Sequence, residues 1–184
     1  YAFGDVKPDG HLPESAGMDF DVTQLVGGDT RYKGGHFAIL YLSPQDYHRV
    51  HHPREGRILG YRYLPGRLWP VFPTATRKVK DLFAVNERLL VRLDAGAAGE
   101  VAVVLVGAYG VGRMTCAFCD LVTNTGGGAE TRDFPTPVPV ARGEELGRFN
   151  LGSTVVLVTE PGKVAWEMTQ GEMVQVGQRI AKVL

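Results

Sequence analysis

The chain has 184 residues, a formal net charge of zero, 44% hydrophobic residues and 22% charged residues. This length and composition fit one globular domain over residues 1–184. The absence of a basic excess argues against nucleic acid as a partner, and no window of about 18 apolar residues predicts a membrane-spanning helix. The chain opens at Tyr1 without an initiator Met, so we expect a trimmed N-terminus, which leaves open a preceding membrane-binding segment.

Short apolar runs separated by Gly, Pro and Asn predict many strands and few helices. After the first run, Ser43 as N-cap and Pro44 at the first helical position predict one helical turn over 43–47. This turn would place His48 and His51 on one face. The stretch 122–145, rich in Gly, Thr and Pro, predicts a long surface loop. Strands are expected at 36–42, 57–63, 88–93, 100–107, 109–118, 154–159, 163–166 and 179–184.

These elements indicate a mainly β (α+β) fold, a single-domain β sandwich or barrel with few short helices. We find no internal repeat strong enough to suggest a solenoid.

Histidines cluster in one part of the chain, because four of the five lie in 36–52. Imidazole titrates near neutral pH, so such a cluster suits proton transfer or metal binding. The same histidines could equally be surface residues of a polar loop, and the pattern alone leaves these alternatives open.

Cys116 and Cys119 form a C-x-x-C pair, the only cysteines in the sequence. The motif suggests half a zinc site or a redox pair. No second C-x-x-C supplies further zinc ligands, and a strand would point the two side chains to opposite faces. The sequence therefore favours two partly buried structural residues, and we assign no metal site.

The run Leu151-Gly152-Ser153-Thr154 contains a bond suited to self-cleavage. No G-x-S-x-G elbow surrounds Ser153, which argues against an α/β-hydrolase. Gly152 has no side chain to shield its carbonyl, and Ser153 can attack that carbonyl if a base takes its proton. Asp9, in Pro8-Asp9-Gly10, would ordinarily organise a turn and gains interest only if a histidine needs an orienting carboxylate.

Six runs of the sequence carry a family resemblance. They are YLSPQDYHRVH (41–51), YLPG (63–66), FAVNER (83–88), VGA (106–108), GEELGRFNLGSTV (143–155) and PGKV (161–164). Together they resemble the bacterial phosphatidylserine decarboxylase family, because they appear in the family's order and cover most of residues 36–165. His52 stands where the family commonly has an apolar residue, and we assign it no role.

This resemblance implies self-cleavage between Gly152 and Ser153. Asp9 would orient His51, His51 would take the proton of Ser153, and Ser153 would attack Gly152. The products would be a β chain, 1–152, and an α chain, 153–184, headed by a pyruvoyl group derived from Ser153. A Schiff base to this covalent cofactor would then support decarboxylation of phosphatidylserine to phosphatidylethanolamine and CO₂, with His48 as the proton donor.

The resemblance also implies a fold similar to duplicated hybrid-motif domains, and Gly171–Ile180 resembles the closing hairpin of lipoyl and biotinyl carriers. We expect phosphatidylserine in a membrane and the α and β chains as partners, with a homodimer left open. The enzyme would act peripherally at the cytoplasmic face of the cell membrane, on an apolar rim that includes Trp69, Val71 and Phe72. The alternatives are a pyruvoyl decarboxylase of a related amino-containing lipid, or a non-catalytic hybrid-barrel carrier or binding module.

Overall fold

The computed structural model describes residues 2–12, 20–110, 112–150 and 154–184. Antiparallel strands dominate this part of the chain, and the helices in it are short. The helices are α1 (Val22–Leu25), α2 (Pro73–Lys78) and α3 (Leu82–Val85), with one 3₁₀ turn at Gly96–Ala98. The strands are β1 (Ala2–Asp5), β2 (His36–Tyr41), β3 (Arg49–His51), β4 (Gly56–Leu64), β5 (Arg88–Asp94), β6 (Glu100–Val106), β7 (Met114–Cys116), β8 (Glu130–Val140), β9 (Glu145–Phe149), β10 (Thr154–Thr159), β11 (Val164–Trp166) and β12 (Ala181–Val183).

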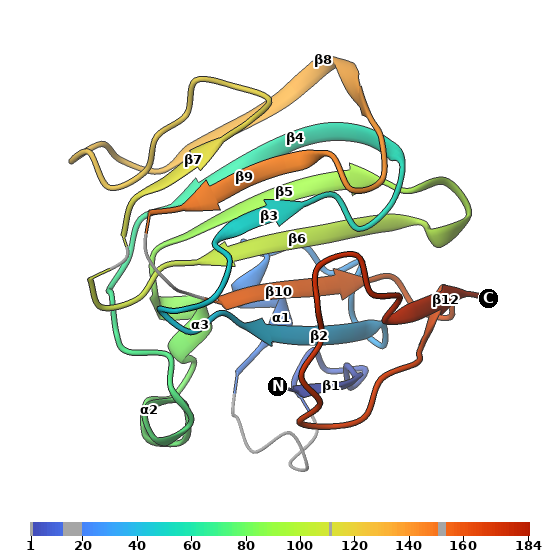
Figure 1. The fold of residues 1–184 in the computed structure, drawn as a ribbon, viewed down its shortest axis with the longest axis horizontal. Coiled ribbons are helices and arrows are strands. Elements are labelled where there is room, and N and C mark those ends of the chain that lie inside the picture. The colour runs from blue at the N-terminus through green and yellow to red at the C-terminus, as the bar shows by residue number, and fades with distance from the viewer. Residues whose placement is uncertain (1, 13–19, 111, 151–153) are drawn as a thin grey trace.

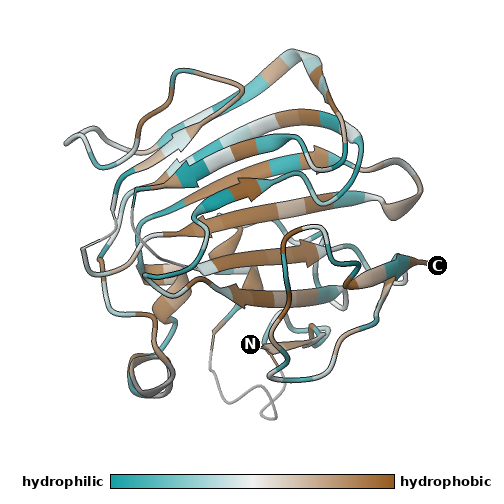
Figure 2. Cartoon of the chain, in the orientation of Figure 1, coloured by the Kyte–Doolittle hydropathy of each residue, from teal (hydrophilic) through white to brown (hydrophobic). Residues whose placement is uncertain are grey.

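Among the described residues, seven strands form one sheet in the order β1-β2-β10-β6-β5-β4-β8 (Figure 1). The central strands β6 and β10 are buried along their whole length. Continuous apolar runs such as these are typical of strands covered on both faces. Figure 2 shows the same pattern, with the hydrophobic colour concentrated on β2, β6 and β10.

A smaller sheet, β3-β9-β7, packs against one face of the large sheet. Val50, Leu146 and Phe149 of the small sheet join one core cluster with Leu105 and Leu157 of the large sheet. Two β sheets packed face to face in this way agree with the mainly β prediction. A separate hairpin, β11-β12, packs at the rim of the same cluster through Val164.

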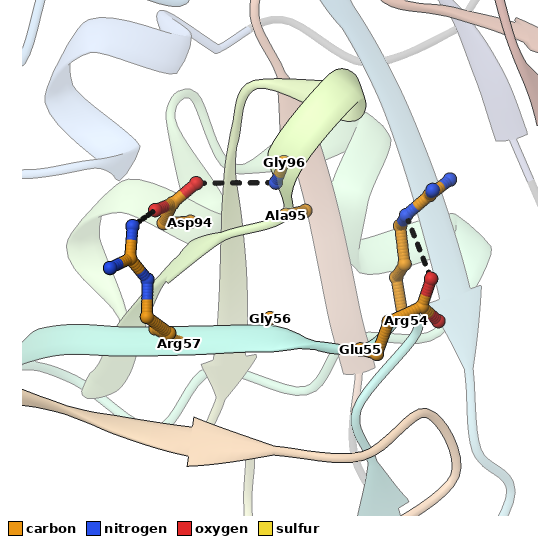
Figure 3. A pocket seen from close by; sticks show the side chains of 7 residues that line it. All are labelled: Arg54, Glu55, Gly56, Arg57, Asp94, Ala95 and Gly96. Carbon is orange, nitrogen blue, oxygen red and sulfur yellow. Dashed lines mark hydrogen bonds and ion pairs between the residues drawn. The ribbon is translucent and has the colours of Figure 1, made fainter.

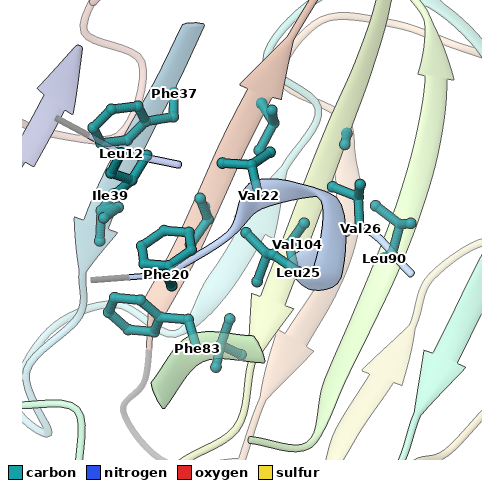
Figure 4. Packing of buried hydrophobic residues seen from close by; sticks show 14 of the residues in the cluster. Leu12, Phe20, Val22, Leu25, Val26, Phe37, Ile39, Phe83, Leu90 and Val104 are labelled. Carbon is teal, nitrogen blue, oxygen red and sulfur yellow. The ribbon is translucent and has the colours of Figure 1, made fainter. Parts of the chain in front are cut away.

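The other face of the large sheet is covered by α1, α3 and the segment that contains Val6 and Leu12. Phe20 meets Phe83 edge to face, with ring centroids 5.5 Å apart. Figure 4 shows these side chains pointing from the covering elements toward Ile39 and its neighbours on the strands. The two cores use alternate residues of the same strands, as expected for side chains that alternate across a sheet.

Residues 122–145 are not the long loop that the sequence predicted, because they contain the 11-residue strand β8. Three prolines, at 135, 137 and 139, made this stretch resemble a loop. Proline removes a backbone donor, which an edge strand tolerates on its unpaired side. β8 is such an edge, since β4 is its one strand partner in the described sheet.

Two smaller predictions also need correction. The segment 43–47 is a turn and not a helical turn: the Asp46 N–H donates to the Ser43 carbonyl, and the Asp46 carboxylate accepts from the Ser43 N–H. The predicted strand 109–118 is reduced to β7, because Tyr109 and Gly110 form a turn. In the described part of the chain, no helix is long and apolar enough to span a membrane.

Candidate active site

The chain segments on either side of residues 151–153 are held beside the histidine loop. The Phe149 N–H donates to the His48 carbonyl over 3.0 Å, and the Asn150 N–H donates to the Arg113 carbonyl over 3.2 Å. On the other side, Thr154 begins β10 and pairs with Tyr41 of β2. The predicted cleavage residues Gly152 and Ser153 lie outside the described residues. The described residue Phe149 is bonded directly to the loop that carries both predicted catalytic histidines.

His51 lies on β3, and both of its ring nitrogens have partners. Its Nδ1 lies 2.8 Å from the Gly143 carbonyl, which can only accept, so Nδ1 carries the proton. Its Nε2 therefore accepts from the Tyr47 hydroxyl, also at 2.8 Å. The Tyr47 and His51 rings stack with an interplanar angle of 9°. These contacts fix the ring and leave Nε2 as the basic nitrogen.

His48 precedes β3 and has a different environment. Its Nε2 lies 3.2 Å from the Pro44 carbonyl, so Nε2 carries the proton. Its Nδ1 is buried and has no hydrogen-bond partner among the described residues. A buried polar atom without a partner is unusual in a folded protein, so this nitrogen is a candidate contact for a reacting group.

Asp9 and His51 lie on opposite faces of the large sheet. Asp9 is in a turn between Val6 and Leu12, which pack into the core on the α1 side, whereas Val50, next to His51, packs on the other side. The Asp9 carboxylate accepts from the His11 N–H over 2.9 Å, and this bond lowers its pKa. The predicted Asp9–His51 contact is therefore not formed. The predicted placement of His48 and His51 on one face of a helical turn is also wrong, because His51 lies in strand β3 and His48 precedes it.

Asn86 is a structural anchor that the sequence reasoning did not single out. This buried side chain accepts from the Trp69 N–H and donates to the Trp69 and Gly107 carbonyls. Gly107 directly follows Val106, which pairs with Thr154. Asn86 thus joins the segment that contains Trp69 to the start of β10. The sequence marked Asn86 only by its place in the FAVNER run (83–88), because its hydrogen-bond partners Trp69 and Gly107 are distant in the sequence.

Glu87 is a second residue that was missed. Its side chain is buried, one carboxylate oxygen has no partner among the described residues, and burial raises its pKa. Hydrogen bonds from Thr123 and Tyr63 oppose that rise. A buried acid of this kind is a candidate for a site residue or for a structural link, and we assign it no catalytic step.

A pocket of about 320 Å³ at the β4–β5 end of the sheet is not this site. Figure 3 shows its lining, including the Arg57–Asp94 ion pair at 2.6 Å and the Gly96 N–H bound to Asp94. Asp94 pairs with Glu100 at the start of β6, whereas Thr154 pairs with Val106 at its other end. The pocket and the histidine loop therefore lie at opposite ends of the sheet.

Comparison with known proteins identifies the family. The family model described as phosphatidylserine decarboxylase matches residues 2–182. The chain belongs to the phosphatidylserine decarboxylase family. Members of this family are pyruvoyl-dependent carboxy-lyases, so the predicted family and cofactor class are confirmed.

Relatives named phosphatidylserine decarboxylase proenzyme support this membership. The protein from Anaeromyxobacter sp. (strain K) is 46% identical over 178 residues, which are 92% of this chain and 62% of the relative. The protein from Myxococcus xanthus is 41% identical, covering 95% of this chain and 64% of the relative. The protein from Brevibacillus brevis is 39% identical, covering 94% and 64%. The chain thus spans less than two thirds of the length of these relatives.

Proposed function

We propose that the protein containing this chain decarboxylates phosphatidylserine to phosphatidylethanolamine and CO₂, after cutting itself between Gly152 and Ser153. Family membership supports the reaction class. The observation that carries the assignment is the Phe149–His48 backbone bond, which ties the approach to the cleavage segment to the histidine loop.

In the proposed maturation step, Ser153 Oγ attacks the Gly152 carbonyl carbon while a base removes the hydroxyl proton. The Gly152–Ser153 C–N bond breaks, and an ester joins Gly152 to Ser153 Oγ. Loss of the Ser153 α proton then breaks the Cβ–Oγ bond and releases the Gly152 carboxylate. One water converts the resulting dehydroalanine to pyruvoyl and releases ammonia. The products are a β chain, 1–152, and an α chain, 153–184.

His51 is the proposed base for this step. Its Nδ1–H is held by the Gly143 carbonyl, which leaves the Nε2 lone pair to take a proton. The Tyr47 hydroxyl occupies that lone pair and must yield to Ser153 or relay its proton. Because Asp9 lies on the other face of the sheet, Gly143 takes the orienting role that the sequence gave to Asp9.

His48 is the proposed proton donor in turnover. The pyruvoyl ketone supplies the sink for the electron pair that remains on Cα when CO₂ leaves. Cα must then receive a proton. The buried Nδ1 of His48 has no competing partner among the described residues, and because Nε2 holds the one ring proton, Nδ1 must first take a proton from the substrate ammonium before it can deliver one to Cα. An unpartnered nitrogen on the histidine loop is what we expect of a residue that meets the pyruvoyl group.

A diacyl substrate requires a membrane-facing surface beside the site. We propose an apolar lip of Trp69, Phe72 and Val85, whose side chains are 48%, 48% and 39% exposed. Val71, which the sequence placed on this rim, is buried in the core. Asn86 ties the lip to Gly107, at the end of β6 beside Thr154. In Figure 1, α2 and α3 lie at the same end of the molecule as the start of β10.

Charge on the same lip suits an anionic headgroup. Arg67, Lys78 and Lys80 are exposed, and none forms an ion pair with another described residue. Aromatic side chains flanked by basic ones are typical of surfaces that rest on anionic lipid. We therefore propose peripheral binding at the cytoplasmic face of the cell membrane.

The single-domain organisation, a homodimer and the kinship with duplicated hybrid-motif domains are further proposals. The carrier-like hairpin predicted at Gly171–Ile180 would have to be formed by β11 and β12, since 171–180 contains no strand. The remaining alternative functions are decarboxylation of another amino-containing lipid and a non-catalytic module.

The test is CO₂ release from carboxyl-labelled phosphatidylserine in vesicles by the protein expressed from its complete gene. We expect release by the wild type and none by Ser153→Ala. A wild type that is inactive on phosphatidylserine and active on another serine-headed or amino-containing lipid would refute the proposed substrate. Inactivity on all of these lipids would favour the module.

A further inference from the structure

Cys116 and Cys119 are brought together by a tight hairpin and do not point to opposite faces of one strand. β7 ends at Cys116, and the chain turns back so that the Cys116 N–H donates to the Leu121 carbonyl and Thr115 pairs with Val122. Both cysteines are free thiols and half-buried, and each thiol shifts the pKa of the other. The hairpin therefore brings the two thiols close enough to interact.

The surroundings make the two thiols unequal. Hydrogen bonding from the Cys116 thiol, with help from the Leu121 N–H and the Arg132 guanidinium, lowers the pKa of Cys119 to about 7. The same interaction and the burial of the thiol raise the pKa of Cys116. A low-pKa thiol attacks other sulfurs as its thiolate, while its neighbour can resolve the product.

Cys119 is also reachable. It lines an open pocket of about 650 Å³ together with Tyr61, Phe118, Glu130, Arg132 and Phe134. The Phe118 ring packs edge to face against Phe134, with centroids 6.2 Å apart, and this contact holds the hairpin against β8. A small molecule can thus approach Cys119 beside the Arg132 guanidinium, whereas Cys116 does not line this pocket.

We propose that Cys116 and Cys119 form a reversible disulfide by exchange with a low-molecular-weight disulfide. The Cys119 thiolate attacks one sulfur of the small disulfide, forming a mixed disulfide and releasing one thiolate. Cys116 then loses its proton and attacks the Cys119 sulfur, which releases the second thiolate. Two protein thiols are oxidised and one small disulfide is reduced to two thiols. This inference is independent of the proposed decarboxylation.

The consequence of the exchange is local to the sheet that carries His51. Cys116 pairs with Gly147 of β9, and Gly147 pairs with Val50 of β3. A disulfide would close the hairpin loop covalently at the edge of this small sheet. The site is therefore a thiol modification site on the same layer as the histidine loop.

The test equilibrates the purified protein with glutathione buffers of increasing oxidised fraction, followed by acid quenching and alkylation. Trypsin releases 114–132 as one peptide, because no Lys or Arg lies between Arg113 and Arg132. We expect this peptide to lose both alkylation sites in one step and to become two hydrogens lighter. The proposal would be overturned if the peptide stays fully alkylated in the oxidised buffers, or if oxidation of the wild type stops at the mixed disulfide with glutathione. Protection of both thiols by a co-purified metal ion would also overturn it.

Two matched variants separate the roles of the thiols. Cys116→Ser retains a hydrogen-bond donor to Cys119 and should accumulate the glutathione adduct at Cys119. Cys119→Ser should form the adduct at Cys116 at least about tenfold more slowly near neutral pH, because its thiolate fraction is smaller. Equal rates in the two variants would contradict the assigned order of attack. The wild-type measurement does not depend on whether either variant folds.

Discussion

At the residue scale, the hydrogen bonds of His51 and His48 predict separate roles. His51→Ala should abolish cleavage between Gly152 and Ser153, because it removes the base held by Gly143. His48→Ala should still be cleaved, but should lose decarboxylation by about 10²–10⁴-fold, the usual contribution of a positioned acid. Denaturing gels measure the cleavage, and CO₂ release measures the turnover.

Asp9→Asn is the matched control for these variants. Since Asp9 contacts His11 on the far face of the sheet, this variant should be cleaved as fast as the wild type. If His48→Ala blocks cleavage as completely as His51→Ala, the division of roles is wrong. If Asp9→Asn blocks it, Asp9 must reach the site in a way that the described contacts do not include.

His52 predicts a pH-dependent stability. Its ring is buried with no partner for either nitrogen among the described residues, and burial lowers its pKa, against an opposing effect of Glu144. The unfolded chain therefore binds a proton at His52 near pH 6.5, where the folded chain resists it. Stability should be full above that pH and should fall as the pH drops below it.

His52→Met should remove this dependence. The variant should be more stable by about 1–3 kcal/mol, the cost of an unpaired buried polar group, and should lose less stability between pH 7 and pH 5. Urea unfolding at both pH values measures the difference. Parallel pH slopes in the wild type and the variant would mean that the pKa of His52 is the same in the folded and unfolded chains, and would contradict the prediction.

At the element scale, a buried ion network joins the strands at the far end of the sheet. Glu100 of β6 accepts from Arg92 of β5 over 2.8 Å, from Arg31 and from the Tyr32 hydroxyl. Arg92 also reaches Asp133 of β8. This network ties the edge strand β8 to the centre of the sheet.

Glu100→Gln should therefore destabilise the fold by about 1–3 kcal/mol, because the buried carboxylate loses its charge beside Arg31 and Arg92, which keep Asp29 and Asp133 as partners. Asp94→Asn, which breaks the exposed Arg57–Asp94 pair, should cost about 0–1 kcal/mol. Thermal unfolding of both variants checks the prediction. Equal shifts in melting temperature would mean that the Glu100 network contributes no more than a surface pair.

The apolar lip makes a prediction about the segment 65–85. Trp69→Ala/Phe72→Ala should weaken co-sedimentation with phosphatidylserine vesicles at least about tenfold, since each aromatic ring contributes about 1.5–3 kcal/mol when fully buried. Met173→Ala/Val176→Ala is the control, because these side chains are 91% and 66% exposed outside the lip. Equal loss of vesicle binding in both double variants would contradict the proposed role of the lip.

At the scale of the whole molecule, the apolar runs predicted the centre of the fold well. Strands expected at 57–63, 88–93, 100–107 and 154–159 correspond to β4, β5, β6 and β10. Continuous burial selects β-branched and apolar residues in β6 and β10, which makes these two strands the easiest to predict. β8 was missed because an edge strand tolerates prolines, and local composition does not show which strand will be an edge.

The site was predictable only in part, for a related reason. Motifs fixed the histidine loop and the cleavage run, and the structure brings their described parts together. The orienting contact of His51 comes from Gly143, which is 92 residues away and offers only a backbone carbonyl. No side-chain pattern encodes a contact to a backbone carbonyl. Asp9 was predicted to orient His51 because it has a carboxylate, but it lies on the opposite face of the large sheet.

Intact-mass spectrometry of the protein expressed from its complete gene tests most directly whether Ser153 becomes the cofactor. We expect two chains separated after Gly152, and the chain that begins at 153 should be lighter by one ammonia than a serine-headed chain. A single uncut chain of encoded mass, or a cut chain that retains an N-terminal serine, would contradict it.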